Sequence, residues 1–105
     1  MSAYLISQVE VLDADAWENY RIRAARATAL FGGRYLVRGA LAEVIEADWP
    51  VEEPPTQTVI VTEFPTMKAL KDWYASPQYA EAFAFRAAAV KRRMIFVSGV
   101  DEPAE

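Results

Sequence analysis

The sequence contains no cysteine and no histidine among its 105 residues. Without cysteine, the chain has neither a disulfide framework nor a thiolate site. Without histidine, it lacks the commonest metal ligand and the commonest general base. Acid–base chemistry would have to come from Asp, Glu, Tyr or Lys, or from water assisted by arginine. The short carboxylate pairs do not supply the several converging oxygens that a hard cation needs. We therefore expect no metal and no cofactor.

A basic stripe and a long apolar run are also missing. The 15 acidic and 11 basic side chains give a net charge of −4, which argues against nucleic acid and anionic membranes as partners. No stretch approaches the ~20 apolar residues of a membrane span, and the N-terminus has no secretory pattern. We expect a cytoplasmic protein. The only basic cluster, Lys91 to Arg93, is expected to end a helix, where cations offset the helix dipole.

The length and composition indicate one globular domain over residues 1–105. About half of the residues, 53%, are hydrophobic and 25% are charged, which is typical of a folded chain with a single core. We expect the core of the domain to span about residues 3–100 and the tail over 101–105 to be frayed.

Hydrophobic periodicity predicts four strands, two helical regions and a proline-containing loop over 48–56. The expected strands are Tyr4–Val11, Arg34–Arg38 with a short extension over 43–46, Gln57–Phe64 and Met94–Val100. Asp13 should cap a first helix, which the glycine pair after Phe31 should end. Thr66 should cap a short helix, and Ser76-Pro77 should start another that runs to about Lys91.

The order strand, helix, strand, strand, helix, strand is typical of a ferredoxin-like α+β fold with an antiparallel sheet. Helices would cover one face of that sheet. Val59–Val61 and Met94–Val97 carry apolar groups at consecutive positions, so both faces of their strands should be apolar. A bare apolar face of that size needs a cover, and a second copy of the same sheet is the simplest one. We therefore expect a homodimer.

Arg86 is the first candidate for a functional site. It falls on the apolar stripe of Tyr79, Phe83 and Val90 at helical spacing, and a buried guanidinium needs a carboxylate or an anionic ligand. Glu63 lies on an otherwise apolar strand face, where it could meet Arg86 across the core. Two interpretations remain open: a structural ion pair that fixes the helix register, or the polar end of a pocket that receives a carboxylate or enolate.

Three aromatic residues, Trp73, Tyr74 and Tyr79, surround the break between the last two helices. They are either core residues or the lining of a cleft above the sheet. Arg34 and Arg38 are expected to share one strand face with Leu36 and to reach solvent or a dimer partner around the strand edge. Arg38 is also kept as a ligand-binding candidate.

Several segments together resemble a known family, the domain of unknown function 1330 (DUF1330), a branch of the dimeric α/β-barrel superfamily. The matching segments, in order along about residues 3–99, are Gly32–Gly39, Glu46 before Asp48-Trp49, Glu63-Phe64-Pro65, Trp73-Tyr74, Ser76-Pro77, Tyr79 and Arg86. Ala47 departs from the glycine usual after the glutamate. The resemblance adds Glu46 to the candidate site residues.

The resemblance implies a barrel made from two ferredoxin-like sheets, with a pocket between the sheet and the helices of each subunit. Members of the superfamily include cofactor-free monooxygenases, small isomerases and haem-degrading enzymes, while this branch has no established reaction. The histidine of several catalytic relatives has no counterpart here. Three hypotheses follow: a homodimer that binds a small anionic or aromatic metabolite, a cofactor-free monooxygenase-like or isomerase-like enzyme, or a purely structural dimer.

Overall fold

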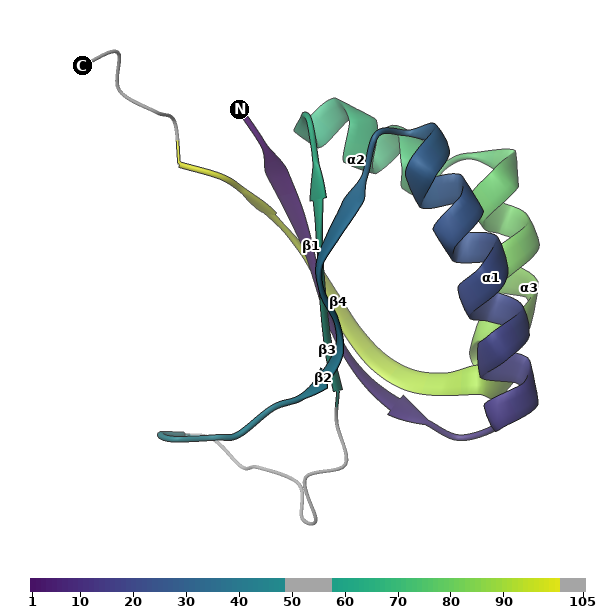
Figure 1. Ribbon diagram of the computed structural model, residues 1–105, viewed down its shortest axis with the longest axis vertical. Coiled ribbons are helices and arrows are strands. Elements are labelled where there is room, and N and C mark those ends of the chain that lie inside the picture. Colours follow the sequence, from purple (N-terminus) through teal and green to yellow (C-terminus); the bar gives the residue numbers. More distant parts are fainter. Residues whose placement is uncertain (49–57, 101–105) are drawn as a thin grey trace.

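The computed structural model describes residues 1–48 and 58–100, and these form one four-stranded antiparallel sheet with three helices on one face (Figure 1). The elements in chain order are β1 (Ala3–Val11), α1 (Ala14–Leu30), β2 (Arg34–Leu41), β3 (Thr58–Phe64), α2 (Met67–Tyr74), α3 (Pro77–Ala89) and β4 (Val90–Ser98). The strand order is β2-β3-β1-β4. The predicted ferredoxin-like α+β fold is confirmed. Among the described residues, no helix is long and apolar enough to cross a membrane.

The predicted helix starts are confirmed by their capping hydrogen bonds. The side chain of Asp13 accepts a bond of 2.9 Å from the backbone N–H of Ala16. Thr66 caps α2, and Ser76 caps α3 directly before a proline in the first turn. These side chains satisfy backbone donors that have no partner within the helix.

Residues after β2 and before β4 differ from the prediction. Residues 43–46 form no strand, and they are exposed on a segment that leads away from the helical layer (Figure 1).

The helix α3 ends at Ala89, and β4 begins at Val90, so the basic cluster Lys91 to Arg93 belongs to a strand and not to a helix end. Val90 is extended and pairs with Val11, because the ladder with β1 continues up to the last helical turn. The expected loop over 49–56, the first residue of the third strand, Gln57, and the tail over 101–105 lie outside the described residues.

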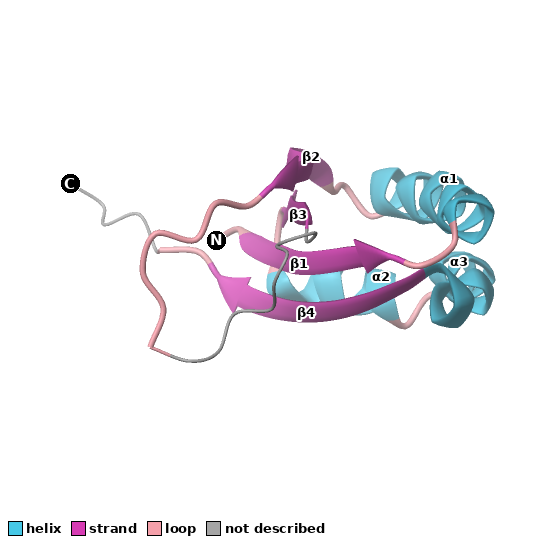
Figure 2. Ribbon diagram, turned by 90° about the horizontal axis from the view of Figure 1, so that it is seen from below, coloured by secondary structure: helices cyan, strands magenta, loops and turns pink. Residues whose placement is uncertain are grey.

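The two sheet faces differ sharply. On the helical side, alternate residues of β1 such as Leu5 and Val9 are buried with Phe64, Leu70 and Trp73. Figure 2 shows α1 and α3 side by side, and their main packing is with each other. The opposite face, which we call the open face, has no helix over it and carries apolar residues that the described chain leaves partly or largely exposed. They are Ile6, Val37, Val59, Val61, Ile95 and Val97.

The turn from α1 into β2 depends on a close contact at Gly33. The preceding Gly32 has a φ of +77°, which glycine adopts without strain. At Gly33 a β-carbon would lie 2.6 Å from Cγ2 of Thr28 and 2.9 Å from the ring of Phe64. The helix end therefore packs against β3 at a distance that excludes any side chain.

We predict that Gly33→Ala lowers the free energy of unfolding by about 1–3 kcal/mol, because the added methyl group overpacks the core. Urea unfolding measures the change. Thr28→Ser removes the nearest methyl group and keeps the hydroxyl that bonds to Ala24. In that background Gly33→Ala should cost less, and equal costs in both backgrounds would contradict the proposed contact.

Candidate functional site

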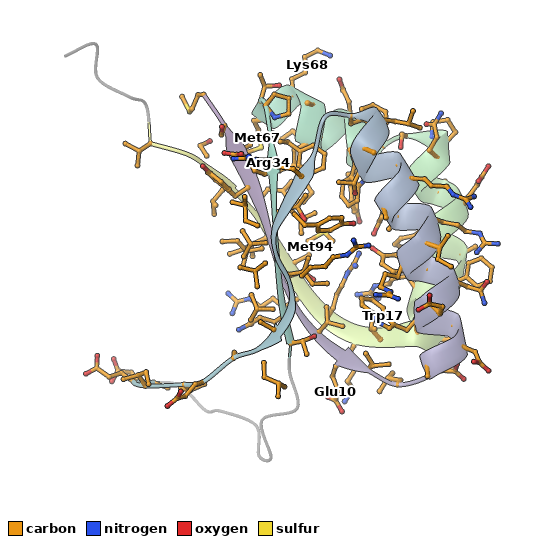
Figure 3. All side chains as sticks on the ribbon, viewed as in Figure 1. Glu10, Trp17, Arg34, Met67, Lys68 and Met94 are labelled. Atoms are coloured by element: carbon orange, nitrogen blue, oxygen red, sulfur yellow. The ribbon has the colours of Figure 1, made fainter. Side chains whose placement is uncertain are left out.

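A cavity of about 250 Å³ lies between the sheet and the helices. Its floor comes from alternate residues of β1, β3 and β4, including Leu5, Ser7 and Met94, and its roof comes largely from α1. In Figure 3, Trp17 extends from α1 toward the sheet and Met94 extends from β4 toward the helices. Most of this lining is apolar or aromatic, which suits a small organic ligand.

Arg92 is the cationic group held inside this layer. It lines the cavity, is half-buried, and donates from Nη1 to the hydroxyl of Tyr20 at 2.6 Å. Its Nη2 donates to the hydroxyl of Tyr79, and the two hydroxyls lie 2.9 Å apart. The guanidinium carbon also lies 5.0 Å from the centre of the Tyr20 ring. One cluster therefore joins β4, α1 and α3.

Both tyrosines of this cluster are buried, and burial raises the pKa of the Tyr20 phenol well above its ordinary value. The Tyr20 hydroxyl therefore stays protonated at neutral pH. Arg92 is held by neutral hydroxyls, and its positive charge is not cancelled by them. A guanidinium has five N–H donors, and two are engaged in this cluster, so further donors remain.

The cavity is rich in positive charge. Arg21, Arg38 and Arg92 line it, and no described Asp or Glu does. Arg21 forms an ion pair of 2.7 Å with Glu18 on the helix surface. Within residues 1–48 and 58–100, Arg38 and Arg92 have no acidic partner. Arg38 is exposed, whereas Arg92 is half-buried, so an anionic group in the cavity would offset the cost of holding the Arg92 charge partly away from bulk water.

Two residues of the lining each bury a polar atom that has no hydrogen-bond partner among the described residues. They are Ser7, through Oγ, and Trp73, through Nε1, and the two residues are 2% and 3% exposed. Both atoms have almost no accessible surface, so neither faces the cavity directly. A buried donor without a partner costs about 1–3 kcal/mol.

The structure separates Arg86 from Glu63 and corrects their proposed pairing. Glu63 alternates with the buried Thr62 and Phe64, so its side chain lies on the open face of the sheet and not under the helices. There it accepts bonds from Nε of Arg34 at 2.7 Å and from the Tyr4 hydroxyl at 3.1 Å. Arg86 is half-buried on α3 and does not line the cavity. Glu63 shares a strand face with Val59 and Val61, as its position in the strand predicted. The helices, however, cover the other face of the sheet.

The other predicted site residues divide between the cavity and other places. Trp73 and Arg38 line the cavity, while Tyr79 lies behind it and bonds to Arg92. Tyr74 is 47% exposed and packs on Trp73 and Tyr79 outside the cavity. Glu46 is exposed on the segment after β2, far from the helical layer (Figure 1).

Sequence reasoning missed Arg92, Tyr20 and Ser7. A signal for Arg92 existed, because Val90, Arg92 and Met94 alternate as residues of one strand face. Reading the basic cluster as a helix end hid that alternation. The sequence pointed to Arg86, an arginine in an apolar series on a helix. The arginine that lines the cavity is Arg92, which lies in an apolar series on strand β4.

The described residues contain no group of three or more acidic side chains able to hold a metal ion.

Comparison with known proteins identifies the family. A family model described as a domain of unknown function, DUF1330, matches residues 2–100. The chain belongs to the DUF1330 family. No match is found among curated proteins.

Solved structures share the fold of this DUF1330 chain at low sequence identity. A protein of unknown function from Rhodopseudomonas palustris is 20% identical, with a TM-score of 0.76, covering 96% of this chain and 84% of that one. SnoaB, a cofactor-independent oxygenase from Streptomyces nogalater, is 16% identical, with a TM-score of 0.60 over 99% and 98% of the two chains. A protein from Mycobacterium tuberculosis is 14% identical, with a TM-score of 0.59 over 99% and 100%. These likenesses show that the chain shares the ferredoxin-like α+β fold of those structures.

The Glu63 cluster predicts an acid-dependent contribution to stability. The hydrogen bond from Arg34, followed by that from Tyr4, lowers the pKa of the Glu63 carboxyl in the folded state. A lowered folded pKa stabilises the protein above the unfolded pKa of about 4.3, and this stabilisation is lost as the pH falls through the folded value. We expect Glu63→Gln to be less stable than wild type at neutral pH, and the difference should shrink below about pH 4.

Urea unfolding across this pH range provides the measurement. Glu81→Gln is the matched control, because Glu81 is an exposed carboxylate of α3 without an ion pair among the described residues. A Glu63→Gln deficit that stays constant with pH would show that lost packing, and not the ionised carboxylate, causes it.

Proposed function

We propose that this protein binds a small anionic metabolite with an aromatic or conjugated skeleton in the cavity between its sheet and its helices. The observation that carries the proposal is the Arg92 guanidinium, which lines the cavity and, within the described part of the chain, has tyrosine hydroxyls and no carboxylate as partners. A carboxylate, phenolate or enolate oxygen would complete its hydrogen bonding with the strength of a charge-assisted contact. The apolar and aromatic lining would hold the skeleton.

The neutral polar residues of the lining support the same class of ligand. Thr58 and Thr62 line the cavity beside its apolar residues, so a ligand with additional oxygen atoms fits better than a plain hydrocarbon acid. Keto acids, hydroxyquinones and hydroxylated aromatic acids have this chemistry.

A ligand screen by thermal shift, followed by calorimetry, tests the proposal with aromatic carboxylates, phenols and quinones. A ligand at a hundred times its Kd adds about 2.7 kcal/mol of stability, which gives a visible change in Tm. Arg92→Met should weaken binding of the best carboxylate by about tenfold or more, because a hydrogen bond to a charged group contributes about 1.5–3 kcal/mol.

Arg86→Met is the matched control for this screen. It removes the same charge from a residue that does not line the cavity, so binding should be unchanged. Equal binding by wild type and Arg92→Met would contradict the anion site. A wild type that no ligand stabilises, together with a badly destabilised Arg92→Met, would instead favour a purely structural role for the cluster.

A second candidate function is a cofactor-free oxygenase. The fold likeness to SnoaB, described as a cofactor-independent oxygenase, favours it, as does a cavity whose donors would stabilise a developing oxyanion. Tyr20 stays protonated and no described carboxylate lines the cavity, so the described lining offers no evident base. The substrate would therefore have to ionise by itself, as acidic phenols and hydroxyquinones do. Oxygen uptake with such a compound, absent in Arg92→Met, is the deciding measurement.

We further propose that two copies pair through their open faces, with this metabolite site repeated in each. Apolar side chains on four adjacent strands form that face, and a monomer would expose all of them to water. Leu41 at the end of β2 and Ile45 beyond it are 72% and 79% exposed, and the segment after β2 extends toward the same side (Figure 1). A partner packed on the open face would cover both features.

We predict a dimeric mass for the wild type in sedimentation experiments at micromolar concentration. Ile95→Lys places a charge on the open face and should give a monomer. Ile22→Lys is the matched control, because Ile22 on α1 has a similar exposure of 43%, against 40% for Ile95, and lies on the helical side. A monomeric wild type, or dissociation by the control alone, would overturn the pairing.

A further inference from the structure

The strand β2 contains two register irregularities that flank Arg38. Tyr35 pairs with Thr62 and Arg38 pairs with Ile60, and the register shifts between Tyr35 and Val37 and again between Arg38 and Ala40. In a regular strand, residues three apart point to opposite faces. The extra residue at Leu36 puts Tyr35 and Arg38 on the same face, the helical one. The predicted common face of Arg34, Leu36 and Arg38 is therefore wrong, and the β-bulge is the physical reason.

Gly39 maintains this arrangement by its backbone conformation. Its φ is +85°, which other residues adopt only with strain. An added β-carbon would meet nothing within 4 Å, so close packing does not require glycine at this position. The glycine instead lets the register shift a second time, so that Ala40 pairs with Val59 on the open face after Arg38 has turned toward the cavity.

The two irregularities separate two arginines of one strand. Arg34 lies on the open face, where Glu63 neutralises it at 2.7 Å. Arg38 lies on the helical face, lines the cavity and stacks on Tyr35, with its guanidinium carbon 4.4 Å from the ring centre. The stacking holds the guanidinium in place while its N–H groups stay available, and the described residues offer it no acidic partner.

Arg38 and Arg92 lie on opposite edge strands of the sheet. The strand order β2-β3-β1-β4 puts two strands between them, so their backbones are about 14 Å apart. Each guanidinium is held by its own aromatic partner, Tyr35 for Arg38 and Tyr20 for Arg92. They therefore do not converge on one point, and a single compact carboxylate would leave one of them without an anion.

We infer that the cavity selects an elongated ligand with two anionic groups, one bound by Arg92 beneath the helices and one bound by Arg38 at the edge of β2. The inference rests on the proposed function and adds the ligand class to it. Aromatic dicarboxylates and ring systems that carry both a carboxylate and an acidic phenol have the required form.

Calorimetry with matched monoanions and dianions tests the inference. The pairs are benzoate with terephthalate, and naphthoate with naphthalenedicarboxylate, measured at one ionic strength. The wild type should bind the dianion of at least one pair about three- to tenfold more tightly than its monoanion, the range expected for one added contact to a partly exposed charge. Arg38→Gln should abolish this preference and leave the monoanion affinity nearly unchanged. Arg38→Lys, which keeps the charge, should retain part of the preference.

Arg26→Gln is the control for overall charge. Arg26 is exposed on α1 and does not line the cavity, so the preference for the dianion should persist in this variant. Equal affinities within both pairs, a preference that survives Arg38→Gln, or a loss that Arg26→Gln reproduces would each overturn the inference. Monoanion binding that depends on Arg92 without a preference for dianions would leave the proposed function intact and reject only the two-anion ligand. Absence of Arg92-dependent binding by either member of each pair would reject both.

Discussion

The cluster of Arg92, Tyr20 and Tyr79 is the interaction on which the layout of this protein depends. Helices α1 and α3 pack mainly on each other, and the space between them and the sheet holds the cavity. The cluster crosses that layer, because Arg92 belongs to β4 while the two tyrosines belong to α1 and α3. A fully apolar contact at this place would close the space. A long polar side chain spans the layer instead and leaves room beside it.

The same physical requirement explains why the cavity is lined by donors. Backbone groups of the sheet and helices are satisfied within their own elements, so only side chains define the polarity of the space between them. Arg92 and Trp73 can donate but not accept, and buried Tyr20 keeps its proton. On the open face the opposite solution appears, since Glu63 neutralises Arg34 there. The sheet thus separates Arg34, which has an acidic partner, from Arg38 and Arg92, which have none among the described residues.

The fold was predictable because each local signal agreed with the others. Asp13, Thr66 and Ser76 cap helices as their side-chain chemistry requires, and in β1 the buried Leu5 and Val9 fall at alternating positions. The ends of elements were less predictable. Val90 leaves the helix because its backbone pairs with β1, and that long-range pairing has no local signature.

The type of residue in the candidate site, an arginine in an apolar series, was predictable from the sequence, but its position was not. Arg86 and Arg92 both fall in apolar series, one at helical spacing and one at strand spacing, and only the true start of β4 decides between them. Arg38 required the bulge at Leu36, which inverts the faces of Val37 and Arg38 until the second irregularity restores the alternation at Ala40. A bulge inserts one residue without changing the composition of the strand, so alternation read from the sequence places Arg38 on the wrong face.

A structural role alone does not account for a cation at position 92. The tyrosine hydroxyls need a hydrogen-bond donor, and a neutral glutamine side chain could donate to them without a charge to desolvate. The guanidinium adds a positive charge in a half-buried place and donors beyond the two that the tyrosines use. In the proposed function, an anion that enters the cavity uses that surplus. The proposal then implies that the energy lost by holding the charge in the empty protein is recovered on binding, so that stability without ligand and affinity for the ligand are opposed at this residue.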